Sequence, residues 1–275
     1  MGVVCLQGSI LRDSGKKGNR TDMKTVTVRN LVIGEGIPKI CVPLMGDATG
    51  VLAAADKVKK THADLVEWRI DTDPEAECVE KTLKTARALR DILGEMPLLF
   101  TIRTKEEGGN MAVSPKLYCE MNEALIASGY IDLVDIEYFK GKSVRDGLLR
   151  SAKVKGVQTV LSSHDFEKTP DGKEMIQRLC SMQQAGADLI KLAVMPRCDE
   201  DVVELLKVTW EMKIRHPDTP VISISMGKKG ALSRLGGELF GSCVTFGAYD
   251  KASAPGQISV EELYEILGKL MVSSI

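Results

Sequence analysis

Short apolar runs and longer segments of helical periodicity alternate along most of this 275-residue chain. The apolar runs, which we predict to be strands, span 39–45, 64–70, 97–103, 131–138, 159–166, 188–195, 220–226 and 243–249. The segments of helical period span 48–61, 75–93, 115–128, 144–155, 172–184, 199–215, 229–237 and 260–271. Strands that alternate with helices of this length pair in parallel, so the pattern predicts an α/β fold.

Capping residues support the predicted helix ends. Pro115 stands in a first turn, Gly129 follows a last turn, and Ser259 with Glu262 forms a capping box. Eight strand–helix repeats with nothing left over predict closure into a (β/α)8 TIM barrel. The alternative is an open doubly wound sheet, but residues 45–50 match its dinucleotide signature G-x-G-x-x-G poorly.

The segment before the first repeat has two parts. Residues 25–28 and 31–33 flank a two-residue connection and predict an N-terminal β-hairpin. Residues 1–22 carry no periodicity, and we interpret them as a disordered leader, a cloning remnant or an upstream start site. The expected domain organisation is therefore a single barrel domain over residues 23–275.

Polar and ionisable side chains share one face of several predicted strands, because residues two apart on a strand point the same way. The residues on that face are Glu67, Arg69, Thr101, Arg103, Asp135, Glu137, Ser162, His164 and Lys191. The outer face of a barrel strand must be apolar to pack against helices, so this polar set is expected to point inward, near the face where barrel enzymes place their chemistry. Charges in such clefts are usually functional, although an ion-pair network that fills the interior is the alternative.

Lys191 stands out because it lies in the middle of 187–196, where residues 189–190 and 192–196 on either side of it are apolar on both faces. Burial disfavours the charged form of a lysine, and a neutral amine attacks carbonyl carbons. The alternative is an ion pair with a neighbouring strand. His164, on the preceding strand, supplies an imidazole suited to proton transfer near neutral pH.

Composition narrows the possible functions. A net charge of −1 argues against nucleic acid or an anionic membrane as the main partner, and no apolar run approaches the roughly 20 residues that span a bilayer. The seven cysteines are scattered and odd in number, without a Cys-x-x-Cys pair, which favours free thiols in a reducing cytosol. With three histidines dispersed among them, we expect no structural or catalytic metal.

A series of short motifs follows in order along the chain: EWR at 67–69, FTIR at 100–103, EEGG at 106–109, SHDF at 163–166, IKLAVMP at 190–196, SR at 233–234, TFG at 245–247 and ASAPGQ at 252–257. Together they resemble the type I 3-dehydroquinate dehydratases, the Schiff-base enzymes of the shikimate pathway. The resemblance runs from about residue 23 to the C-terminus. It implies a cytoplasmic, cofactor-free homodimeric lyase that converts 3-dehydroquinate to 3-dehydroshikimate through a lysine imine, in aromatic amino acid biosynthesis or quinate catabolism.

The resemblance also assigns roles to individual residues. Lys191 would form the imine, His164 would be the general acid/base, and Glu107 would be the carboxylate partner of that histidine. The positions that match substrate-binding residues are Glu67, Arg69, Arg103, Arg234, Ser253 and Gln257. By composition alone, residues 105–109 read as a solvated loop, in which nothing favours Glu107 over its neighbour Glu106.

Two positions depart from the family pattern. Pro43 stands where some relatives have a serine near the substrate, and Ser163 stands where an asparagine often precedes the histidine. Neither departure removes a catalytic group. We interpret Met195 and Met226 as core residues, and leave Phe246 open between core and ligand contact.

The residues alone, without the resemblance, leave two other functions possible. A different Schiff-base barrel enzyme, such as an aldolase, shares the lysine and the acid/base group, whereas a binding protein would hold a carboxylate metabolite without turnover. The motifs at 163–166 and 252–257 favour the dehydratase over the aldolase. The buried lysine with a nearby imidazole favours both enzymes over the binding protein.

Overall fold

The computed structural model describes residues 24–249 and 256–271. Its barrel strands are β3 (Lys39–Met45), β4 (Leu65–Arg69), β5 (Leu98–Thr101), β6 (Leu133–Glu137), β7 (Gln158–Asp165), β8 (Leu189–Val194), β9 (Val221–Ser225) and β10 (Val244–Ala248). Each lies inside or within one residue of a predicted strand. The predicted leader at 1–22 and the site residue Ser253 lie outside the described residues.

The strands close into the predicted barrel. They pair in parallel and in chain order from β3 to β9, and β10 pairs back with β3. Between β9 and β10, a parallel bridge joins Val221 to Ser242, and the N–H of Cys243 donates to the carbonyl oxygen of Val221 at 2.8 Å. The (β/α)8 prediction is confirmed, and the open doubly wound sheet is excluded. A short strand that the sequence pattern did not predict, β11 (Ile258–Ser259), extends β10.

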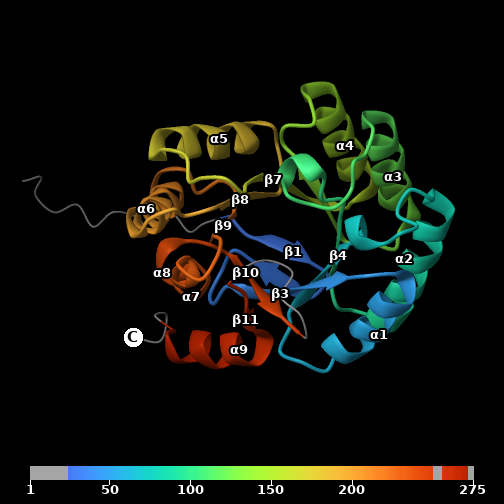
Figure 1. Ribbon diagram of the computed structural model, residues 1–275, viewed down its shortest axis with the longest axis horizontal. Helices are drawn as coiled ribbons and strands as arrows, with labels where there is room; N and C mark the ends of the chain where they lie inside the picture. The colour runs from blue at the N-terminus through green and yellow to red at the C-terminus, as the bar shows by residue number, and fades with distance from the viewer. Residues whose placement is uncertain (1–23, 250–255, 272–275) are drawn as a thin grey trace, which may run out of the picture.

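Helices surround the strands on the outside (Figure 1). They are α1 (Ala48–Val58), α2 (Val79–Leu93), α3 (Pro115–Ser128), α4 (Lys142–Lys155), α5 (Gly172–Gln184), α6 (Asp199–Arg215), α7 (Ala231–Leu235), α8 (Gly237–Phe240) and α9 (Val260–Lys269). The capping box that begins α9 is present, since Ser259 Oγ accepts the N–H of Glu262 at 3.3 Å. Within the described ranges, no helix is long and apolar enough to cross a membrane.

The helix predicted at 229–237 is present as α7, but the sequence pattern did not predict α8, the separate short helix that follows it. The first of these ends at Gly236, whose N–H closes the last turn on Leu232. Gly237 then passes so close to Pro38 and Ser242 that a Cβ there would lie 2.6 Å from an atom of each. The chain breaks its helix at this point because the backbone must approach the base of the barrel closely.

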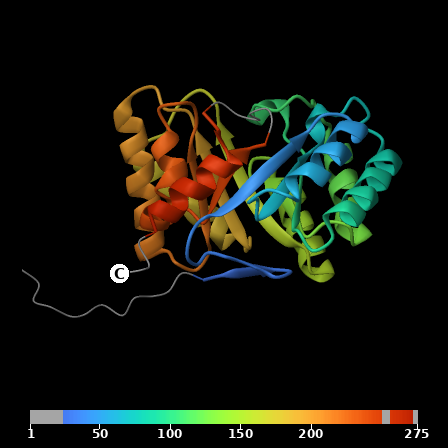
Figure 2. The ribbon, with the colours of Figure 1, turned by 90° about the horizontal axis from the view of Figure 1, so that it is seen from below.

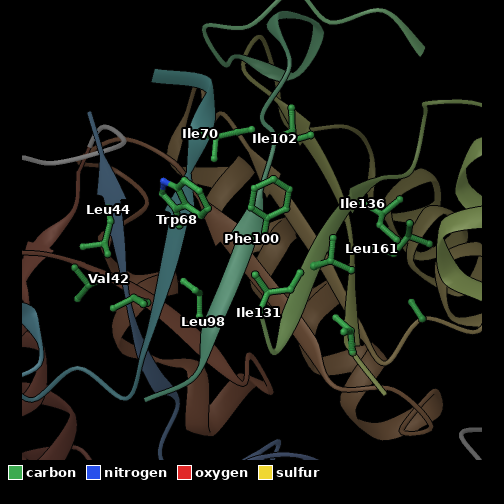
Figure 3. Packing of buried hydrophobic residues seen from close by; sticks show 14 of the residues in the cluster. Val42, Leu44, Trp68, Ile70, Leu98, Phe100, Ile102, Ile131, Ile136 and Leu161 are labelled. Carbon is green, nitrogen blue, oxygen red and sulfur yellow. The ribbon is translucent and has the colours of Figure 1, made fainter. Parts of the chain in front are cut away.

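Two apolar layers stabilise the barrel. The outer layer fills the space between strands and helices, and in Figure 3 Trp68 of β4 lies beside Phe100 of β5, with ring centroids 5.5 Å apart. The inner layer closes one end of the barrel, where the predicted hairpin of β1 (Val26–Val28) and β2 (Leu31–Ile33) packs across the interior (Figure 2). The interior is therefore apolar at the hairpin end, and polar groups lie toward the carboxyl ends of the strands.

Candidate active site

A pocket opens at the carboxyl ends of the barrel strands and collects most of the predicted site residues. Its polar lining consists of Glu67, Arg69, Arg103, His164, Lys191, Arg234 and Gln257. Its apolar lining consists of Gly108, Phe166, Ala193, Ile224, Met226 and Phe246. The inward alternation predicted along the strands is what brings these side chains from separate parts of the sequence into one place.

Lys191 is almost completely buried, with 4% of its surface exposed. Its Nζ lies 3.5 Å from Oε1 of Glu67 and 4.0 Å from Oδ2 of Asp135. The same nitrogen lies 4.4 Å from the centroid of the Phe246 ring, a cation–π contact. An ion pair, which the sequence left as an alternative, is thus present, but its partners lie on β4 and β6 and not on a strand that neighbours β8. It holds the amine at the wall of the pocket.

Arg103 joins the carboxylates inside the barrel. Its Nη1 donates to Glu137 at 3.0 Å and its Nη2 to Asp135 at 2.8 Å, while Oε2 of Glu107 lies 3.4 Å from Nη1. Burial by itself would lower the pKa of Arg103, but the charges of Asp135 and Glu137 outweigh it and raise that pKa above its ordinary value. Arg103 therefore remains charged, and its guanidinium is already engaged by protein carboxylates.

His164 and Glu107 form a close pair beside the pocket. The Nδ1 of His164 lies 2.9 Å from Oε2 of Glu107, and the backbone N–H of His164 donates to the same oxygen at 3.0 Å. Burial, with the positive charges of Arg103 and Lys191, holds the pKa of His164 well below its usual value. The contact assigns the Nδ1–H tautomer, which leaves Nε2 as a neutral acceptor.

Glu107 reaches this position through a short turn after β5. Residues 105–107 form the 3-10 helix η2 (Lys105–Glu107), and Gly108 ends it with a φ of 78°. The next residue, Gly109, approaches the backbone so closely that a Cβ would lie 2.0 Å from the carbonyl oxygen of Arg103. Burial raises the pKa of Glu107 above its ordinary range, and nearby Glu137 adds to this effect against Arg103.

The remaining arginines enter the pocket from different elements. Arg69, at the end of β4, donates from Nε and Nη2 to Asp71 at 2.6 and 2.9 Å, which fixes its direction. Arg234 belongs to α7, where the hydroxyl of Ser233 ties the helix to β9 by accepting the N–H of Ser225 at 2.9 Å. Burial lowers the pKa of Arg234 to about 10, which leaves it positively charged at neutral pH.

The structure thus brings together eight of the nine residues predicted for the site. Seven line the pocket, and Glu107 lies outside the pocket lining, where it contacts His164. Ser253 lies outside the described residues. The core interpretation missed that Met226 lines the pocket, and it left Phe246 open; both are buried like ordinary core residues, so composition offered no signal that separates the two roles.

The two departures from the family pattern lie off the pocket. Ser163 is buried on the side of β7 away from His164, where its Oγ accepts a hydrogen bond from Arg178 of α5 at 3.0 Å. Pro43 of β3 is not part of the pocket lining. In the described part of the chain, no group of three or more histidines, cysteines, aspartates or glutamates is placed to hold a metal ion.

A buried lysine beside a histidine–carboxylate pair, at the carboxyl ends of parallel strands, defines a (β/α)8-barrel site equipped for covalent chemistry at a carbonyl carbon. The family model described as Type I 3-dehydroquinase matches residues 40–273. A 3-dehydroquinate dehydratase of Salmonella agona is 47% identical over 246 residues, which cover 89% of this chain and 98% of the relative.

Solved structures agree with the family match. A type I 3-dehydroquinate dehydratase from Clostridium difficile, solved with covalently modified comenic acid, has a TM-score of 0.88 at 42% identity and covers 90% of this chain and 98% of its own. The 3-dehydroquinate dehydratase of Geobacillus kaustophilus has a TM-score of 0.88 at 39% identity, over 92% and 98% of the two chains. The chain belongs to the type I 3-dehydroquinase family.

Proposed function

We propose that this chain dehydrates 3-dehydroquinate to 3-dehydroshikimate through an imine on Lys191. The observation that carries the proposal is the position of the Lys191 amine, which lines the pocket together with His164. A carbonyl compound that enters this pocket meets a primary amine on one strand and a neutral imidazole on the next. Membership in the type I 3-dehydroquinase family supports the substrate.

The first stage makes the substrate acidic. Condensation of the Lys191 amine with the C3 ketone releases water and leaves a protonated imine, which withdraws electrons from the adjacent C2–H bond. Nε2 of His164 takes the C2 proton, and the electrons of that bond flow toward the imine nitrogen. The Oε2 atom of Glu107, 2.9 Å from Nδ1, orients the ring and stabilises the imidazolium that forms.

The second stage forms the conjugated product. The electrons return from nitrogen, the C1–O bond breaks, and the His164 imidazolium supplies the proton with which the hydroxyl leaves as water. Hydrolysis of the remaining imine frees the Lys191 amine and 3-dehydroshikimate. The four protein groups needed are an amine, a base that becomes an acid, an orienting carboxylate and an anion-binding residue, so the scheme requires no cofactor and no metal.

The substrate carboxylate is assigned to Arg234. Guanidinium binds carboxylate through two parallel hydrogen bonds, and burial strengthens such a contact. Arg103 contacts Asp135 and Glu137, Arg69 contacts Asp71, and both add positive charge to the lining of the pocket. Glu67, Gln257 and Ser253 are assigned to the substrate hydroxyls.

We further propose that residues 23–275 act as one catalytic domain in a cytoplasmic homodimer. The closed barrel supports the single domain. The six cysteines in the described ranges are all free, which suits a reducing compartment. The dimer rests on the family resemblance, and light scattering of the purified protein measures it directly: a mass of one chain contradicts it.

The experiment that tests the function is an absorbance assay with authentic 3-dehydroquinate. Because the product has a carbonyl conjugated to a carbon–carbon double bond, its formation raises ultraviolet absorbance. We expect a rise with the wild-type protein and none with Lys191→Ala, whose fold is checked by circular dichroism. An aldolase would cleave a carbon–carbon bond and form no such chromophore, and a binding protein would leave the absorbance unchanged.

A further inference from the structure

Glu137, the last residue of β6, is completely buried and holds the chain where it leaves β5. Its Oε1 accepts the N–H of Thr104 at 2.9 Å, and its Oε2 accepts the hydroxyl of the same residue at 2.7 Å. Oε1 also accepts a hydrogen bond from Nη1 of Arg103 at 3.0 Å. One carboxylate therefore fixes the two residues that lead into η2.

Glu137 is itself anchored from a helix and from a neighbouring strand. Its backbone N–H donates to the hydroxyl of Tyr118, a buried residue of α3, at 3.0 Å. The next backbone N–H, that of Tyr138, donates to the carbonyl oxygen of Ser162 on β7 at 2.8 Å. Because these contacts surround the end of β6, the Glu137 carboxylate starts from a fixed point of the barrel.

Thr104 is the pivot of the turn that carries Glu107. Its carbonyl oxygen accepts the N–H of Glu107 at 3.0 Å and the N–H of Gly109 at 2.8 Å. Glu107 in turn contacts both the ring and the backbone of His164. A continuous series of hydrogen bonds therefore runs from Glu137 through Thr104 and Glu107 to the imidazole that lines the pocket.

We propose that Glu137 is a positioning residue for the Glu107–His164 pair, which it holds in place through the turn that begins at Thr104. This inference rests on the proposed function and assigns no proton transfer to Glu137. The residue lies outside the pocket lining and does not need to reach the substrate. A displacement of about 1 Å can reduce the rate about 100-fold, so a residue that acts only through the turn still controls turnover.

The charge of Glu137 favours the same pair. Burial raises the pKa of Glu107, and the charges of Glu137 and Asp135 add to this effect against that of Arg103. Negative charge beside the pair also favours the imidazolium that forms when His164 takes a proton. Glu137→Gln should therefore keep the positioning effect and lose only this smaller contribution.

The first test is the steady-state kinetics of Glu137→Ala with 3-dehydroquinate, after circular dichroism has shown that the variant is folded. We expect kcat to fall on the order of 100-fold because the turn loses its anchor. KM should change only a few-fold, since the turn carries none of the residues assigned to the substrate. Unchanged kcat in a folded Glu137→Ala protein overturns the inference.

A double-mutant cycle separates positioning of the pair from general damage to the barrel. If Glu137 acts through Glu107, its replacement by alanine in a Glu107→Ala protein should lower kcat by no more than about threefold, because the two effects are then not additive. A further loss on the order of 100-fold in the Glu107→Ala protein would assign the effect to Arg103 or to the barrel as a whole, and overturns the inference.

Two single variants serve as matched controls. Glu137→Gln keeps an oxygen for the Thr104 N–H and for Arg103, and its amide can donate to the Thr104 hydroxyl, so we expect kcat within about tenfold of wild type. Glu106→Gln removes a carboxylate charge from the same turn at an exposed position, and kcat should stay within about twofold, since exposed charges are screened. Equal losses in Glu106→Gln and Glu137→Ala would overturn the inference.

Thr104 provides the test if Glu137→Ala does not fold or Glu107→Ala is too slow to measure. Thr104→Val removes the hydroxyl that Oε2 of Glu137 accepts, whereas Thr104→Ser keeps it. We expect kcat to fall several-fold in the valine variant and to stay within about twofold of wild type in the serine variant. Equal kcat values in the two variants overturn the inference.

The position of the pair can also be measured without turnover. The ring N–H signal of His164 in the proton NMR spectrum, assigned by its loss in His164→Ala, should shift in Glu137→Ala and Thr104→Val and stay in place in Glu106→Gln. An unshifted signal in Glu137→Ala overturns the inference. A wild-type protein that forms no enone from 3-dehydroquinate contradicts the proposed function instead, and the signal still tests the role of Glu137.

Discussion

Oε2 of Glu107 contacts His164 at two points, the ring nitrogen Nδ1 at 2.9 Å and the backbone N–H at 3.0 Å. Because one oxygen meets both groups, the imidazole cannot rotate without losing the carboxylate that its own backbone holds. This fixes the tautomer in which Nε2 accepts the proton. The base of the proposed mechanism is thereby set before any substrate binds, which reduces reorganisation during catalysis.

The acid side of the pH–rate profile follows from this site. Burial, with the charges of Arg103 and Lys191, lowers the pKa of His164 well below its usual value of 6.5. The proposed mechanism uses the neutral ring as the base. Protonation therefore removes activity only at a pH below that of an ordinary histidine, so kcat/KM should remain level as the pH falls through 6.5. Measuring kcat/KM of the wild-type protein from pH 4.5 to 8 tests this expectation. An acid limb centred at or above 6.5 would contradict it.

Arg103→Met should destabilise the fold strongly. The substitution leaves Asp135 and Glu137 buried without their cation, and breaking a buried pair in this way costs roughly 3–5 kcal/mol. Protonation neutralises carboxylates that have lost their cation, so the loss of unfolding free energy should be larger at pH 8 than at pH 5. Denaturant unfolding at both pH values measures it. Arg215→Met, which breaks an exposed pair with Glu211, serves as control and should lose about 1 kcal/mol or less.

Arg234→Ala should weaken substrate binding more than it slows chemistry. Loss of a charge-assisted bond to a carboxylate removes about 1.5–3 kcal/mol, which is roughly 10- to 200-fold in affinity. Arg234→Lys keeps the charge but not the two-bond geometry, so its KM should fall between wild type and alanine. Steady-state kinetics of both variants supplies the check. Unchanged KM and kcat in Arg234→Ala would place the carboxylate at another residue.

Gly256, next to Gln257, offers a test of how Gln257 is held in the pocket. Gly256 has a φ of 76°, and a Cβ there would lie 2.2 Å from the carbonyl oxygen of Gly227. Gly256→Ala should therefore displace Gln257 and raise KM several-fold. Gly129→Ala is the control, since its φ of 75° imposes the same backbone strain of roughly 1 kcal/mol with no atom within 4 Å. A similar rise in both KM values would show that the close approach is unimportant.

Much of the barrel could be predicted because the chain alternates strongly between buried strands and amphipathic helices. The same alternation placed Glu67, Arg103 and Lys191 on the inner face, since a strand has two faces and only one can pack against helices. Register between strands is a tertiary property. That Arg103 pairs with Asp135 and Glu137, rather than remaining free for a ligand, could not be inferred from separate segments.

The loop residues were hardest to assign without a family resemblance. Glu106 and Glu107 are adjacent and chemically alike, yet Glu106 is exposed and Glu107 is buried against His164. The close packing of Gly109 on the backbone of Arg103 turns the Glu107 carboxylate inward, and the local composition does not indicate this packing. Likewise, Met226 is buried as a core residue would be, so its place in the pocket depended on the closed barrel.

The most direct measurement of the central claim is the location of a trapped substrate adduct. Wild-type protein is incubated with 3-dehydroquinate, reduced with borohydride, weighed intact and then digested for peptide mapping. We predict one added ligand on the peptide that contains Lys191, and none in Lys191→Ala treated in the same way. An adduct on a different lysine, or turnover in Lys191→Ala at the wild-type rate, would contradict the account.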